Sequence, residues 1–233
     1  MMSGKFGITP VSARVAPFFI FCALTAGQGK LGHSSQYWVY LAKTVLGAWM
    51  LWSLRSNLPE MNWSFGWDAV AAGILVFVLW VGLEKHYPDA NALMNKVQGK
   101  VLPQANPIPW NPPRDFGDGS PTAWFFILVR IAGSSLVVPP LEEVFYRSFL
   151  YRYIIAADFL AVPLSRFMLR AFIFTALFFG FSHNEWLPGI LCACVFQGLV
   201  CWKGRLGDAI TAHAITNCLL GIWVVWKAAW NFW

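Results

Sequence analysis

Residues 67–83 read WDAVAAGILVFVLWVGL, a run of seventeen residues in which Asp68 carries the only charge. The length is close to the roughly 20 apolar residues that a helix needs to cross a membrane. Apolar residues follow one another without a break, whereas a strand of a membrane barrel alternates apolar and polar side chains. A bilayer accommodates only helices or closed barrels, so this run predicts an all-helical membrane fold.

The composition of the whole chain agrees with that prediction. Hydrophobic residues make up 58% and charged residues 12%, and the mean hydropathy is +0.53. Soluble domains carry about 25% charge. The net charge is +6, but the basic residues are scattered between apolar runs, which is typical of loops that fix membrane orientation. We therefore expect membrane lipids as partners and no nucleic acid.

Seven further runs have a length similar to residues 67–83. The predicted fold class is all-α, a polytopic membrane protein of about eight transmembrane helices with an intramembrane active-site cavity. The eight predicted helices are Val15 to Ala26, Tyr37 to Leu54, Trp67 to Leu83, Ala123 to Leu141, Val144 to Leu164, Phe167 to Phe181, Leu187 to Trp202 and Ala209 to Trp226. For the first of these, a signal peptide ending near Ala26 is the alternative.

A proline-rich stretch divides the chain. Residues 84–121 contain seven of the 14 prolines, and no helical period continues through them. We therefore predict N-terminal transmembrane helices in residues 1–83, an extramembrane loop in residues 84–120 and a C-terminal helix bundle in residues 121–233.

Three ionisable residues in the stretch EEVFYR, residues 142–147, stand between two apolar runs. An ionisable group at membrane depth costs roughly 2.5 to 3.5 kcal/mol on insertion scales, so such a group is paired, hydrated or functional. Glu143 and Arg147 are four residues apart and predict an ion pair on one helix face. Glu142 is rotated by about 100° and has no cation on its own helix. Pro139 and Pro140 predict a kink or a restart of the helix just before this group.

Two of the four histidines fall within predicted helices or at their ends. His183 ends the run FTALFFGFSH, and His213 lies one turn before Asn217 in DAITAHAITN. A single histidine on an apolar face is more often a core residue, and an ion pair within a bundle often only fixes helix register. Two histidines, an asparagine and an unpaired glutamate in one predicted bundle favour a catalytic site instead.

Hydrolysis of a peptide bond requires these types of group. Water must lose a proton, and the oxyanion that develops must be stabilised. A desolvated Glu142 suits the role of general base, and His183 can hold the same water. His213 and Asn217 lie at i and i+4 and can both donate toward one oxygen. No serine or cysteine nucleophile with an adjacent base, phosphate loop or HExxH pair is apparent.

Three short motifs carry a resemblance to a known family. EEVFYR fits EExxxR, FGFSH at 179–183 fits FxxxH, and HAITN at 213–217 fits HxxxN. In this order they resemble the CPBP family, intramembrane proteases that include the type II CAAX prenyl endopeptidases and bacteriocin-processing or self-immunity proteins. The resemblance covers about residues 120 to 230, and the N-terminal third is expected to add only membrane helices. The tryptophan-rich N-terminal half also resembles bacterial CAAX-protease-related proteins associated with exosortase systems, without a motif to support it.

The resemblance implies a glutamate-dependent intramembrane endopeptidase. Glu142 and His183 would activate water, and His213 with Asn217 would bind the oxyanion. Glu143 and Arg147 would form the supporting ion pair. The expected substrate is a peptide or protein, lipidated or membrane-anchored substrates included, and the expected location is the bacterial inner (cytoplasmic) membrane.

Other interpretations stay open at this point. A non-catalytic scaffold or immunity-type protein would retain the pocket, and a proton-coupled transporter would use the buried carboxylates. We expect no cofactor and no metal ligands, with zinc as the alternative because two glutamates and two histidines are acceptable zinc ligands.

Overall fold

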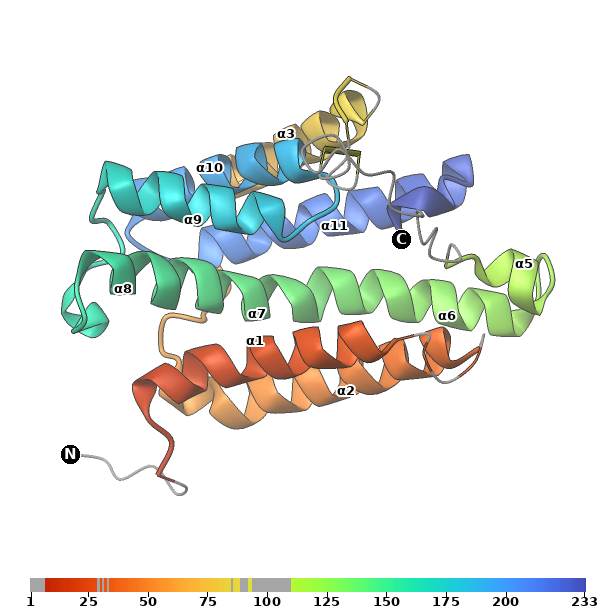
Figure 1. Ribbon diagram of the computed structural model, residues 1–233, viewed down its shortest axis with the longest axis horizontal. Helices are drawn as coiled ribbons and strands as arrows, with labels where there is room; N and C mark the ends of the chain where they lie inside the picture. The colour runs from red at the N-terminus through yellow and green to blue at the C-terminus, as the bar shows by residue number, and fades with distance from the viewer. Residues whose placement is uncertain are drawn as a thin grey trace.

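The computed structural model describes residues 7–28, 30, 32, 34–84, 86–88, 92–93 and 110–233. These residues form an all-helical bundle, and no strand occurs among them (Figure 1). The α-helices are α1 (Pro10–Gly27), α2 (Ser35–Leu54), α3 (Trp67–Leu83), α5 (Pro112–Phe116), α6 (Pro121–Ala132), α7 (Val138–Glu143), α8 (Tyr151–Ile155), α9 (Leu169–Phe181), α10 (Trp186–Lys203) and α11 (Gly207–Lys227).

One long helical stretch runs through the middle of the bundle. Two π-helical segments, Gly133–Val137 and Val144–Leu150, join α6, α7 and α8 into a continuous stretch over Pro121–Ile155. The α1–α2 pair lies on one side of it, and α3, α9, α10 and α11 lie on the other (Figure 1). The runs at 123–141 and 144–164, predicted as two spans, therefore share one helical stretch, and a count of eight transmembrane helices is not confirmed.

The wider turns of the first π-helical segment explain why Pro139 and Pro140 do not interrupt the stretch. The Val138 N–H donates to the Gly133 carbonyl, five residues back, instead of the Ser134 carbonyl, four residues back. The next bond in this register would come from Pro139, which has no N–H. The helix thus continues, but the Ser134 carbonyl is left without a donor from its own helix. Of the predicted kink or restart before the glutamates, the restart does not occur, because the helix widens instead.

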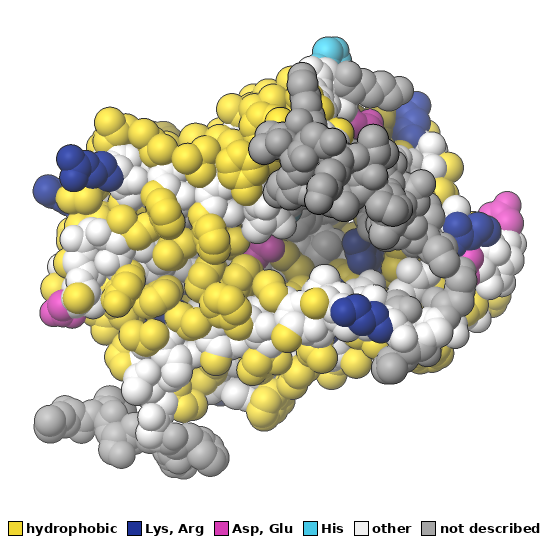
Figure 2. Space-filling model, viewed as in Figure 1, with side chains coloured by type: hydrophobic (Ala, Val, Ile, Leu, Met, Phe, Trp, Pro, Cys, Tyr) yellow, Lys and Arg dark blue, Asp and Glu magenta, His cyan; other side chains and the backbone are white. Residues whose placement is uncertain are grey.

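The outer surface of the bundle suits a lipid environment. Four helical stretches are long and apolar enough to cross a membrane, namely α1, Pro121–Ile155, α10 and α11, while α3 and α9 are apolar but shorter. Hydrophobic side chains cover the face over α1, α7 and α9, and charged side chains gather mostly toward the two ends (Figure 2). The chain is therefore an integral membrane protein.

Helix α3 packs along α11 and α10, so it joins the C-terminal helices in space. A Cβ atom on Gly73 would lie 2.6 Å from the Ala212 carbonyl oxygen, which shows how closely α3 and α11 approach. The Thr216 hydroxyl donates to the Gly73 carbonyl at 2.9 Å. This contact fixes α3 against the turn of α11 that follows His213.

A buried polar cluster fixes α1 against α8 at the N-terminal end of α1. Arg14 donates to the two oxygens of Glu60 at 2.7 and 3.0 Å. The Ser148 hydroxyl also donates to Glu60, and Arg152 donates to that hydroxyl at 2.7 Å. Burial raises the pKa of Glu60, and hydrogen bonds from Arg14 and Ser148 lower it. The lowering effects together are the larger, so the pKa of Glu60 lies below its ordinary value.

Most of the predicted proline-rich loop falls outside the described residues. The described part contains α5, which Asn111 caps by accepting a hydrogen bond from the Arg114 N–H at 3.1 Å. The extramembrane position of this loop stays a prediction.

Candidate active site

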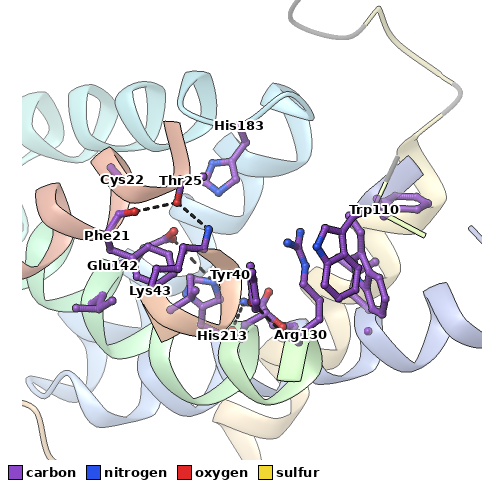
Figure 3. Close-up of a pocket in the computed structure, with 18 of the residues that line it drawn as sticks. Phe21, Cys22, Thr25, Tyr40, Lys43, Trp110, Arg130, Glu142, His183 and His213 are labelled. Carbon is purple, nitrogen blue, oxygen red and sulfur yellow. Dashed lines mark hydrogen bonds and ion pairs between the residues drawn. The ribbon is translucent and has the colours of Figure 1, made fainter. Parts of the chain in front are cut away.

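A cavity of about 750 Å³ opens between the two sides of the bundle (Figure 3). Glu142, His183, His213 and Asn217 all line it. They come from α7, from the turn after α9 and from α11, so three segments distant in the sequence meet there. Glu142 is far from both ends of the Pro121–Ile155 stretch, which is one of the four helical stretches long and apolar enough to cross a membrane.

Glu143 links Arg147 and His213 beside the cavity. Its Oε2 lies 3.1 Å from Arg147 Nε in an ion pair, and both side chains are 0% exposed. Its Oε1 lies 2.9 Å from His213 Nδ1. Because an ionised carboxylate only accepts hydrogen bonds, Nδ1 carries a proton and donates. Glu143 thus fixes the orientation of the His213 ring, with Nε2 on the far side of the ring.

Glu142 and His213 face each other across the cavity. His213 Nε2 lies 4.0 Å from Glu142 Oε2, which is longer than a direct hydrogen bond. Among the described residues, no group donates to this oxygen. The carboxylate therefore presents an acceptor to whatever enters the space between the two side chains (Figure 3).

His183 is held by the backbone of the helix that precedes it. Its Nδ1 lies 2.8 Å from the Phe179 carbonyl oxygen, which only accepts, so Nδ1 donates. In the neutral ring Nε2 is then an acceptor. The Ser182 hydroxyl donates to the same carbonyl at 2.7 Å, and the Tyr146 hydroxyl donates to Ser182 at 3.1 Å. Tyr146 thereby connects the Glu142 helix to the His183 turn.

The short helix α9 ends beside the cavity, where the half-buried His183 lines it. It has 13 residues, or about 20 Å at 1.5 Å per residue. Its C-terminal end crosses α10 closely, because a Cβ atom on Gly189 would lie 2.9 Å from the Gly180 Cα atom. Phe179 packs its ring 4.6 Å from the His183 ring and 4.5 Å from the Arg147 guanidinium, measured from its centroid.

Asn217 does not point only into open space. Its Nδ2 donates to the Ser134 carbonyl at 2.8 Å. This is the carbonyl that the π-helical segment and Pro139 leave without a donor from the helix, which explains why a side chain from α11 serves it. An amide carries two N–H bonds, so one stays available for a further acceptor.

Several lining residues were missed from the sequence. Cys22, Tyr40 and Lys43 of α1 and α2 line the cavity, and Arg130 of α6 does so too, so helices outside the three motifs contribute to its wall. A lysine in the middle of an apolar run is a signal that would have identified Lys43. The contact between Glu143 and His213 joins residues 70 positions apart and leaves no trace in local spacing.

Within the described ranges, no group of three or more His, Cys, Asp or Glu side chains is arranged to hold a metal ion. Glu143 is already engaged by Arg147 and His213.

Comparison with known families adds an independent line of evidence. Residues 123–219 match a family model described as Rce1-like, type II CAAX prenyl endopeptidase Rce1-like. This segment is Rce1-like. No curated protein matches the chain, and no solved structure does. The Rce1-like segment contains all seven residues that the three motifs specify, while α1, α2 and α3 lie outside it. The Rce1-like family is a protease family, which supports a hydrolase and suggests intramembrane protease activity.

Proposed function

We propose that the protein is an intramembrane endopeptidase that uses glutamate-activated water. The observation that carries the proposal is the convergence of Glu142, His183, His213 and Asn217 on one cavity among helices that suit a membrane. An unpaired carboxylate and two imidazoles are costly there unless they are used. They match the requirements for hydrolysing a peptide bond without a covalent intermediate.

In the proposed mechanism Glu142 takes a proton from the attacking water. Its Oε2 has no donor among the described residues, so it is available to accept that proton. His183 accepts the second hydrogen of the same water through Nε2, because its Nδ1 is committed to the Phe179 carbonyl. The water is thereby oriented with a lone pair toward the substrate carbonyl.

The developing oxyanion is bound from the α11 side. His213 donates through Nε2 when its ring is protonated, and the Glu143 carboxylate at Nδ1 stabilises that protonated ring. Asn217 donates with the N–H that Ser134 does not use. Arg147 neutralises Glu143 and lies over the Phe179 ring, so one guanidinium supports both halves of the site.

The proposed substrate is a peptide or protein, lipidated or membrane-anchored substrates included, and the proposed location is the bacterial inner membrane. The apolar exterior supports access from the bilayer, because the cavity lies among helices whose outer faces suit lipid.

The test is a comparison of Glu142→Gln with Glu143→Gln. Full-length protein in detergent is incubated with a peptide library, and products are identified by mass spectrometry. Glu142→Gln keeps the shape but removes the base, so turnover should fall by about 10² to 10⁴-fold while peptide binding is retained. Glu143→Gln should reduce activity together with thermal stability.

The outcomes separate the possible roles. Wild-type turnover in Glu142→Gln with an inactive, stably folded Glu143→Gln would mean that the two carboxylates have exchanged roles. If neither substitution affects cleavage, the protease proposal fails. Retention of the cellular activity in Glu142→Gln would favour a scaffold, and substrate flux in proteoliposomes would favour a transporter.

A further inference from the structure

Two cationic side chains in the cavity have no anionic partner among the residues that the structure describes. Lys43 of α2 and Arg130 of α6 both line it. Within the part of the chain that the structure describes, no carboxylate lies within 4.0 Å of either cation. The acidic residues that line the cavity are Glu142 and Glu185. Glu142 faces His213, and Glu185 lies in the turn before α10.

Lys43 is the more isolated of the two. Its side chain is 3% exposed, and its ammonium donates to the Thr25 hydroxyl at 2.8 Å. The nitrogen also lies 4.7 Å from the centroids of the Phe21 and Tyr40 rings. An ammonium has three donors, so two stay available toward the cavity (Figure 3).

Arg130 lies in an aromatic surrounding. Its guanidinium carbon is 4.6, 5.2 and 5.9 Å from the ring centroids of Tyr40, Trp110 and Trp233. These rings stabilise a cation and hold its plane in one orientation, but they do not neutralise it. Lys43 and Arg130 both lie against the Tyr40 ring, and both line the same cavity.

Keeping two such cations inside the bundle costs stability. A buried charge without a counter-ion is strongly unfavourable, and an ionisable residue in a membrane bundle normally has a partner or a function. The missing partner must carry a negative charge and must reach the cavity. A carboxylate has the geometry that a guanidinium binds with two parallel hydrogen bonds.

We propose that Lys43 and Arg130 form an anion-binding subsite that receives a carboxylate of the peptide substrate. This proposal rests on the proposed function, because the same cavity contains Glu142. The carboxylate lies close in sequence to the bond that is cleaved, since one cavity holds both. It belongs either to the C-terminus of the peptide or to an aspartate or glutamate side chain.

The test uses full-length protein in detergent and one synthetic peptide library in three forms. The first form has free C-terminal carboxylates and no Asp or Glu, the second has C-terminal amides and contains Asp and Glu, and the third has amides and neither acid. We expect the first or the second form to exceed the third by about tenfold to hundredfold in kcat/KM, the usual range for a charge-assisted hydrogen bond. Which of the two exceeds it identifies the source of the carboxylate.

Variants then assign the preference to residues. In Lys43→Met and Arg130→Met the ratio between the preferred form and the third form should fall toward one. The matched control is Lys30→Gln, which removes an exposed cation outside the cavity and should leave the ratio unchanged. Lys43→Met should also melt at a higher temperature than the wild type, because a buried unpaired charge is removed. A merely structural lysine would give a lower melting temperature.

Binding of fluorescent peptides to Glu142→Gln gives a readout without cleavage. Tighter binding of carboxylate peptides to Glu142→Gln, lost in the double variant Glu142→Gln with Lys43→Met, supports the subsite. If this result is obtained and the wild type cleaves no peptide, the subsite stands and only the proposed function fails. Equal binding and equal cleavage of the three forms, or ratios that neither cation variant changes, would overturn the subsite.

Discussion

Replacing Arg147 by methionine tests whether the buried ion pair holds the site together. Methionine matches the aliphatic part of the side chain but removes the charge, together with the guanidinium that lies over the Phe179 ring. Glu143, which is 0% exposed, is then left with His213 as its remaining contact. We expect a loss of stability and of activity together.

The magnitude follows from the geometry. At the observed 3.1 Å between Arg147 Nε and Glu143 Oε2, two unit charges attract by about 5 kcal/mol when the effective dielectric constant is about 20. The hydrogen bond from His213 offsets part of this loss. Breaking a buried pair by removing one partner typically costs about 3 to 5 kcal/mol, and we expect a value in that range.

Unfolding in SDS, followed by the fluorescence of the 14 tryptophans, measures this change. The control is the double variant Glu143→Gln with Arg147→Met, which removes both charges and should be more stable than Arg147→Met alone. A single variant within about 1 kcal/mol of the wild type, or a double variant whose loss is the sum of the two single losses, would refute the reasoning.

Two further predictions concern other parts of the bundle. Asn217→Ala should lower turnover in peptide cleavage by about 10² to 10³-fold, because one oxyanion donor is removed. The same substitution leaves the Ser134 carbonyl without a donor, and thermal melting measures the resulting loss of stability. Because the folded-state pKa of Glu60 lies below its ordinary value of 4.5, its carboxylate stabilises the fold above that pH, and the contribution is lost as the pH falls below it. Melting temperatures from pH 7 to pH 3 should therefore fall less steeply in Glu60→Gln.

The sequence predicted those elements whose limits are set by local signals. Helix α3 has the predicted bounds, Trp67–Leu83, because its apolar run begins after Gly66 and ends at Glu84. The division after Leu141 was wrong for a local reason as well. Prolines commonly interrupt a helix. Here the π-helical turn lets the helix continue past Pro139 and Pro140, and the Asn217 amide donates to the Ser134 carbonyl that lacks a backbone donor.

The candidate site was predictable as a set of chemical groups and less so as an arrangement. The i to i+4 spacing indicates which partners Glu143 and Asn217 have on their own helices. It gives no information on contacts between helices, such as Glu143 with His213 or Asn217 with Ser134. Lys43 was missed because it lies in α2, whereas all three motifs lie in the C-terminal half of the chain.

The shortness of α9 has a consequence for the bilayer around the protein. At about 20 Å this helix is some 10 Å shorter than the hydrocarbon core of a typical membrane. Lipids beside it must thin or tilt to avoid exposing their tails, and headgroups with their water then descend along that flank. This mismatch brings water toward the depth of His183 without a long channel through the protein. The thickness of the host membrane thereby becomes a variable that tunes hydration of the site, and reconstitution in lipids of graded chain length would alter the access of water to it.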